Sequence, residues 1–199
     1  MILQEGINYT FSQIFELSGE TDEVLADLGY SYQIAAIDLP VSLLHVPETL
    51  QTIGVKMRER LPLVPLTNET ARREFYVAPF LFAVLDEARF KMSIEYNITT
   101  QRLRGDVDYL LRGTNNIAVV EAKRADTERG FTQLAAELIA LATYRPEFPN
   151  LLYGAVTTGE LWRFGLLDRA SQTITKDLDV YLLPRDLERL FNIFLALLA

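Results

Sequence analysis

Two stretches decide the fold of this chain: Arg104-Gly-Asp-Val-Asp-Tyr-Leu-Leu111 and Ile117-Ala-Val-Val-Glu-Ala-Lys123. Both contain the β-branched and aliphatic residues that favour strands. The segment between them, Arg112-Gly-Thr-Asn-Asn116, is rich in residues that tolerate a positive φ angle. The pattern therefore predicts a β-hairpin.

Charged side chains stand on one face of each predicted strand. Because side chains alternate between the two faces, Asp106 and Asp108 share a face, and so do Glu121 and Lys123. The hairpin would bring these groups to one edge of a sheet, where a divalent metal ion can bind. The alternative is an exposed strand whose charges merely pair with those of a neighbour.

The arrangement resembles the core of the PD-(D/E)XK nuclease superfamily, in its restriction-endonuclease-like branch. The signature of that family is an acidic residue that begins one strand and a Glu-x-Lys that ends the next, here Glu121-Ala122-Lys123. Its first half usually reads as an aspartate before an aromatic and aliphatic residues, which matches Asp108-Tyr-Leu-Leu111 better than Asp106. Val107 stands in place of the family's proline. The resemblance thus favours Asp108 as the metal ligand and leaves Asp106 as the alternative.

The segment before the hairpin, Asn68-Glu-Thr-Ala-Arg-Arg-Glu-Phe-Tyr-Val-Ala-Pro-Phe-Leu81, resembles the opening helix of the same family. In that helix a glutamate near the start precedes a proline and an aliphatic run, and Glu69 is the matching residue. A glutamate just after a Thr67-Asn68 cap is also favoured by the helix dipole in any protein. Both a metal-site role and a capping role stay open for Glu69.

After the hairpin, Gly130-Phe-Thr-Gln-Leu-Ala-Ala-Glu-Leu-Ile-Ala-Leu-Ala-Thr-Tyr144 predicts an amphipathic helix. Many members of the superfamily carry a glutamine near the start of this helix and a tyrosine further along. Gln133 matches the glutamine, Glu137 occupies the usual tyrosine position, and Tyr144 follows later on the same stripe. The stripe faces either the active site or solvent.

The chain then continues as two predicted strands, Leu151-Leu-Tyr-Gly-Ala-Val-Thr157 and Glu160-Leu-Trp-Arg-Phe164, joined by a turn. The resemblance therefore runs from Glu69 to Tyr144 and into these strands. It implies an α/β (α+β) fold with a restriction-endonuclease-like core, in which helices flank a central mixed β-sheet. An N-terminal α/β extension precedes that core.

Composition narrows the chemistry of any site. The 199 residues suit one domain, and the chain has no cysteine and a single histidine, His45, most simply an ordinary core or surface residue. Carboxylates are then the remaining candidate metal ligands, and hard oxygen ligands favour Mg²⁺ or Mn²⁺ over zinc. Neither a signal peptide nor a membrane-spanning run is recognised, so we expect a soluble, cytoplasmic protein.

The net charge of −8 is unevenly distributed. Residues 1–55 hold eight acids and no lysine or arginine, whereas residues 56–129 hold thirteen basic and eleven acidic residues. The candidate site thus lies in the locally basic part, where phosphates can approach. The residues that we expect to contact nucleic acid are Arg72, Arg104, Arg124 and Tyr144. Scattered arginines on a solvated surface are the alternative.

Outside the hairpin region, periodicity predicts helices over residues 11–28 and 47–61 and strands over residues 30–39 and 93–99. Residues 1–65 form an acidic extension packed on the core, which spans residues 66–199. Near the end, Pro184 fits the first turn of a helix with one apolar face. That face must be buried on the sheet or against a second subunit, and a homodimer would suit cleavage of two antiparallel strands.

The resemblance implies a mechanism. Asp108, Glu121 and the backbone carbonyl of Ala122 would bind one or two magnesium ions, with Glu69 acting through water. Lys123 would orient the attacking water or stabilise charge on the phosphate, and Gln133 would position the lysine or a phosphate. DNA is the expected substrate. Two alternatives stay open: a non-catalytic binding or assembly module on the same scaffold, and an α/β protein of another class.

Overall fold

The predicted hairpin lies within a mixed β-sheet. Its strands β4 (Leu103–Arg112) and β5 (Ile117–Ala122) pair antiparallel, with Tyr109 opposite Val120 and Arg112 opposite Ile117. The computed structural model describes residues 1–44, 46–114, 116–123 and 126–198, so one residue of the predicted turn, Asn115, lies outside the described residues, as do His45 and Arg124. Within the described part, the sequence-based prediction of a hairpin is confirmed.

The remaining strands extend this sheet in both directions. Its order is β1-β4-β5-β6-β7-β8-β2, while β3 pairs with β4 and β9 pairs with β7. The pairs β1–β4, β5–β6 and β2–β8 are parallel, and the others are antiparallel. The bounds are β1 Tyr9–Thr10, β2 Ser31–Ala35, β3 Lys91–Thr99, β6 Leu151–Thr157, β7 Leu161–Asp168, β8 Thr173–Asp177 and β9 Tyr181–Leu182. Two strands of the N-terminal segment, β1 and β2, thus belong to the same sheet as the hairpin.

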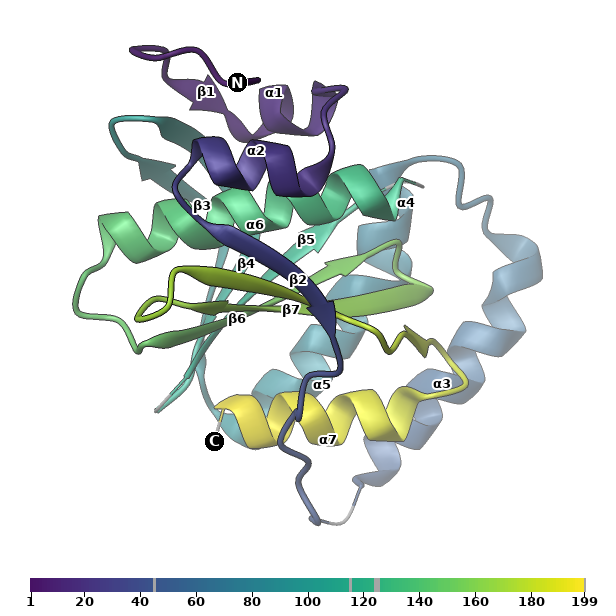
Figure 1. Cartoon of the computed structure of the whole chain (residues 1–199). Coiled ribbons are helices and arrows are strands. Elements are labelled where there is room, and N and C mark those ends of the chain that lie inside the picture. Colours follow the sequence, from purple (N-terminus) through teal and green to yellow (C-terminus); the bar gives the residue numbers. More distant parts are fainter. Residues whose placement is uncertain (45, 115, 124–125, 199) are drawn as a thin grey trace.

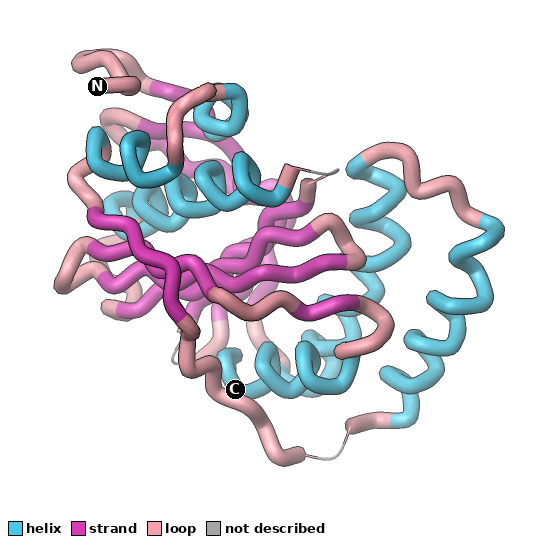
Figure 2. Tube along the Cα trace, turned by 45° about the vertical axis from the view of Figure 1, so that its right-hand side comes forward, coloured by secondary structure: helices cyan, strands magenta, loops and turns pink. Residues whose placement is uncertain are grey.

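Helices cover both faces of the sheet (Figures 1 and 2). One face packs against α1 (Phe11–Glu16), α2 (Thr21–Asp27) and α6 (Thr127–Tyr144). The other packs against α3 (Glu48–Arg60), α5 (Ala78–Ala88) and α7 (Leu187–Leu198). The fold is therefore a mixed α/β architecture with a large central sheet flanked by helices. Within the described residues, none of the helices combines the length and apolar character that a membrane span requires.

The helix predicted at residues 68–81 forms and continues to residue 88. It begins as α4 (Glu69–Arg72), where the Asn68 side chain accepts a hydrogen bond of 2.7 Å from the Ala71 N–H. It passes through a π-helical turn, η2 (Arg73–Val77), and continues as α5. The sequence predicts the cap and the helix, but it does not predict the π turn.

Two predictions in the flanking segments are wrong. Residues 11–28 form two helices, because the chain is extended at Leu17 and leaves the helix between α1 and α2. Pro184 lies ahead of the last helix, which begins at Leu187, because residues 183–186 form a turn that the Asp186 carboxylate closes by accepting the Leu182 N–H at 2.8 Å. The apolar face of α7 is buried against the sheet and α5, not left for a second subunit.

Candidate active site

The candidate residues meet where the two strands of the hairpin separate. Ladder pairing between β4 and β5 ends at Tyr109 and Val120, and on the same side of β4 its first two residues, Leu103 and Arg104, pair with β1. In the gap lies a cleft of about 440 Å³, which the N-terminal end of α1 also lines. Side chains from β4, β5, α4 and α6 line it, among them Glu69, Asp108, Glu121, Lys123 and Gln133.

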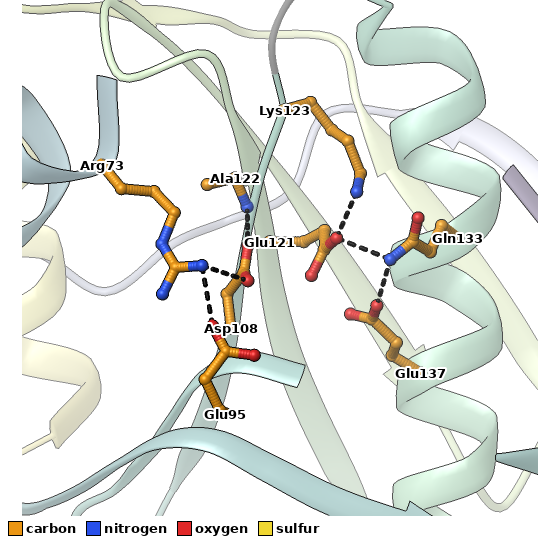
Figure 3. Close-up of polar contacts among 8 residues, drawn as sticks. All are labelled: Arg73, Glu95, Asp108, Glu121, Ala122, Lys123, Gln133 and Glu137. Atoms are coloured by element: carbon orange, nitrogen blue, oxygen red, sulfur yellow. Dashed lines mark hydrogen bonds and ion pairs between the residues drawn. The ribbon is translucent and has the colours of Figure 1, made fainter. Parts of the chain in front are cut away.

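Asp108 spans the gap between the strands. One of its carboxylate oxygens accepts a hydrogen bond of 2.8 Å from the backbone N–H of Ala122 (Figure 3). This side-chain contact connects β4 and β5 beyond the last backbone pair of their ladder. The other oxygen faces the Arg73 guanidinium at 3.1 Å. Burial raises the pKa of Asp108, while the Ala122 N–H and Arg73 act in the opposite direction. The first acid of the motif is thus buried, and both of its oxygens have partners.

Glu121 is the most deeply buried of the motif acids, with 2% of its surface exposed. Its Oε1 lies 2.6 Å from Lys123 Nζ and accepts a hydrogen bond of 2.5 Å from Gln133 Nε2. Burial raises its pKa to about 7, and the neighbouring Asp108 carboxylate adds to the effect. Burial alone would lower the pKa of Lys123, but the Glu121 carboxylate outweighs it, so the net pKa is raised and the lysine stays charged.

Gln133 links Glu121 to a second buried acid, Glu137. The Nε2 group of Gln133 donates one hydrogen bond to Glu121 Oε1 and another, of 2.8 Å, to Glu137 Oε1 (Figure 3). Glu137 has no exposed surface, and its pKa is raised well above the ordinary value by burial and by the Glu121 carboxylate. The alternative of a solvated helix face is therefore wrong for these two residues of α6. Glu137 was placed on the stripe of Gln133 by the sequence but was not expected to be a site residue.

The other expected site residues lie at varied distances from this cluster. Glu69 follows the Asn68 cap at the start of α4 and lines the cleft, so it fits both of its expected roles. Asp106 also lines the cleft, but it is exposed and accepts a hydrogen bond of 2.9 Å from Asn97. Tyr144 is 42% exposed at the far end of α6, and it is not among the residues that line the cleft.

The arginines expected to contact nucleic acid also differ. Arg104 is exposed on β4, one strand step beyond Gly105 of the cleft. Arg72 donates a hydrogen bond of 3.2 Å to the carbonyl of Thr158, in the turn between β6 and β7. Arg124 lies outside the described residues. Of the two arginines that the structure describes, Arg104 is the exposed one and Arg72 is partly buried.

Sequence reasoning missed the contribution of Arg73 and Glu95. Arg73 Nη1 lies 2.7 Å from Glu95 Oε1 as well as 3.1 Å from Asp108 Oδ1 (Figure 3). The sequence shows Arg73 as one of several basic residues. Nothing in the alternation of β3 marks Glu95 as a residue that points to the cleft.

The buried acids predict an unusual pH dependence for the metal-free protein. The ordinary pKa of Glu121 is 4.5, and it is raised to about 7 in the fold. Between these values the folded state binds more protons than the unfolded state, so the free energy of unfolding should fall as pH rises, by roughly 1.4 kcal/mol per pH unit for each such carboxylate. Urea unfolding in EDTA between about pH 5 and 7 measures this slope.

The variant Glu137→Gln tests the origin of this slope. It keeps the shape of the side chain and the oxygen that accepts the hydrogen bond from Gln133. It removes one of the two buried carboxylates and lowers the penalty on the other. The slope should therefore flatten, and stability at neutral pH should rise. An unchanged slope in Glu137→Gln would show that the pair does not control the pH dependence.

The donor set fits a hard divalent cation in part. Oε2 of Glu121 is buried without a hydrogen-bond partner in the described structure, and the oxygens of Asp108 and Glu121 are the ligand type that Mg²⁺ and Mn²⁺ prefer. Among the described residues, no group of three or more His, Cys, Asp or Glu side chains is arranged to hold a metal ion. Any ion would therefore rely on these two carboxylates, the Ala122 carbonyl and water.

Comparison with known proteins offers no family assignment. Function must then be argued from the site, since a fold by itself does not define an activity. No protein-family model matches this chain, and a search of curated proteins gives no significant match either.

Proposed function

We propose that this protein is a metal-dependent nuclease with a restriction-endonuclease-like core of the PD-(D/E)XK type, which hydrolyses phosphodiester bonds in DNA. The observation that carries the proposal is the convergence of Asp108, Glu121, Lys123 and Gln133 at the point where β4 and β5 separate. The four residues come from three separate elements. Their meeting in one cleft is what the motif resemblance requires.

Asp108, Glu121 and the backbone carbonyl of Ala122 would hold Mg²⁺ or Mn²⁺, with Glu69 linked through water. Such an ion polarises the scissile phosphate and lowers the pKa of bound water. The lining of the cleft supports the need for a cation, because Glu69, Glu95 and Asp106 leave an excess of acids even after Arg73 and Lys123 are set against the two ligands. Without added positive charge, this cleft would repel a phosphate.

The side chains of the protein have distinct roles in this proposal. Lys123 keeps its proton beside Glu121 and offers a charged donor to the attacking water or to the phosphate oxygens. Gln133 holds the Glu121 carboxylate in one orientation through its bond of 2.5 Å. Arg104 contributes a phosphate contact beside the cleft. A homodimer would supply two such sites for cleavage of both strands.

A second candidate function is a catalytically inactive binding or assembly module on the same scaffold. The ion pairs favour it, because Arg73 and Lys123 already neutralise Asp108 and Glu121 within the chain. In that case, the charges stabilise the fold and no metal is needed. The two candidates differ in their response to divalent cations.

Cleavage assays distinguish the two functions. We expect cleavage of at least one substrate among plasmid, linear duplex, single-stranded DNA and RNA when Mg²⁺ or Mn²⁺ is present, and none with EDTA. Glu121→Ala should abolish the activity, whereas Glu87→Ala, an exposed glutamate on α5, should not change it. Absence of cleavage on every substrate, or full activity in Glu121→Ala, would contradict the nuclease proposal.

A further inference from the structure

The strand β3 is distorted at a single residue beside the candidate site. Its register with β4 runs without a shift from Lys91 opposite Arg112 to Thr99 opposite Arg104, and pairing is missing only at Glu95 and Asp108. Glu95 has a φ angle of 52°, a left-handed conformation that is uncommon for a residue other than glycine. Strain of this kind persists only where the surrounding structure holds it, and it often marks a functional site.

The helix that carries Arg73 is also irregular. The helix leaves its α-helical geometry for the π-helical turn η2 (Arg73–Val77) before it continues as α5. Turns of this type are rare and are found frequently at functional sites. Two backbone irregularities thus lie close to Asp108.

Both irregularities meet in one contact. Glu95 and Asp108 stand directly opposite each other on neighbouring strands, a position where like charges destabilise a sheet. Arg73 Nη1 lies between them, 2.7 Å from Glu95 Oε1 and 3.1 Å from Asp108 Oδ1. The guanidinium also lies 5.4 Å from the centre of the Tyr109 ring, and the side chain is only 20% exposed. The arginine is therefore held in place from three sides.

We propose that Arg73 is an internal cation that competes with the divalent metal for Asp108. Glu95 weakens this competition because it binds the same guanidinium and takes up part of its positive charge. The inference rests on the proposed function and concerns the regulation of its metal site. Arg73 contacts Asp108 Oδ1, an oxygen that the metal would need, and two cations repel each other at such a distance. Metal binding requires Arg73 to withdraw toward Glu95, to which it is already closer.

Removal of the arginine should therefore tighten metal binding. In Arg73→Gln the metal no longer displaces a charge-assisted hydrogen bond, so the dissociation constant for Mn²⁺ should fall about tenfold. Glu95→Gly should have the opposite effect, because Arg73 then gives its whole charge to Asp108, and the constant should rise about threefold. Glycine adopts the positive φ angle of residue 95 readily, so this variant keeps the backbone.

The experiment is a Mn²⁺ titration of four proteins: wild type, Arg73→Gln, Glu95→Gly and the double variant, with free Mn²⁺ measured by electron paramagnetic resonance. If Glu95 acts through Arg73, Glu95→Gly has no effect in the Arg73→Gln background. Far-ultraviolet circular dichroism and thermal unfolding check that each variant is folded.

The outcomes separate this inference from the proposed function. If wild type binds Mn²⁺ and folded Arg73→Gln binds it no more tightly, the proposed competition is wrong, whereas the metal site is still supported. An equal loss on Glu95→Gly in both backgrounds would show that Glu95 acts on the metal directly and not through Arg73, and it also overturns the proposal. If none of the four proteins binds Mn²⁺, the metal site itself is wrong, and the inference about Arg73 is wrong as well.

Discussion

The Lys123→Met variant is expected to cleave DNA about 100- to 1,000-fold more slowly than wild type, the usual effect of removing one fixed donor to transition-state charge. Methionine preserves the length and most of the volume of the side chain but has no charge and no N–H. Lys123 is the charged donor next to Glu121, with Nζ 2.6 Å from the carboxylate. At saturating metal the loss should appear in kcat. The metal should bind no more weakly than to wild type, because lysine is not a ligand and its removal frees Glu121 from an ion pair.

The matched control is Lys91→Met. Lys91 is an exposed lysine at the start of β3, where it pairs with Arg112 at the end of β4. It is not among the residues that line the cleft. Its replacement should leave cleavage unchanged. A Lys123→Met protein with a kcat within about threefold of wild type would remove the lysine from the mechanism.

The Phe194→Ala variant should lower the free energy of unfolding by about 3–5 kcal/mol, the range for a large aromatic residue removed from a core. Phe194 is fully buried on α7. Its ring centre lies 5.5 Å from that of Phe80, 5.7 Å from that of Trp162 and 5.6 Å from that of Phe164. Truncation would leave a cavity between α5, α7 and β7, which the surrounding rings fill only in part.

Urea unfolding followed by circular dichroism measures this loss. Phe82→Ala is the matched control, because Phe82 lies on α5 with 48% of its surface exposed and should cost well under about 1.5 kcal/mol. Similar losses for the two variants would mean that the aromatic cluster does not form the core between the sheet and its helices.

The hairpin and the helix at residues 127–144 were predictable because their patterns are local. Alternation places Asp108 on the face that meets Glu121, and helical spacing aligns Gln133 with Glu137. Whether that stripe faces the site or solvent could not be decided, because a buried glutamate and an exposed one look the same in a sequence. Only the hydrogen bonds of Gln133 to both acids reveal the difference.

Short or polar strands were missed. The strand β8 (Thr173–Asp177) escaped notice because Lys176 and Asp177 look like surface residues, yet both are buried. Lys176 pairs with Glu128, and Asp177 accepts the backbone N–H groups of Ile37 and Asp179. Their partners lie far away in the sequence or in a loop, and a local pattern does not contain that information. The two-residue strands β1 and β9 are too short to show any period.

The Arg73–Glu95 contact was out of reach for a related reason. It depends on a π turn in one element and a left-handed residue in another, and each changes the direction of a side chain without changing the hydrophobic period. An arginine and a glutamate at these positions fit an ordinary helix and strand equally well. Tertiary structure, and not propensity, brings them to Asp108.

The most direct test of the account is a Mn²⁺ titration of the wild-type protein beside Glu121→Gln, because it needs no knowledge of the substrate. We predict saturable binding by wild type that is at least about tenfold weaker in Glu121→Gln and unchanged in the surface control Glu87→Gln. Absence of saturable binding by wild type, or equal binding by folded Glu121→Gln, would contradict the metal site on which the proposed function depends.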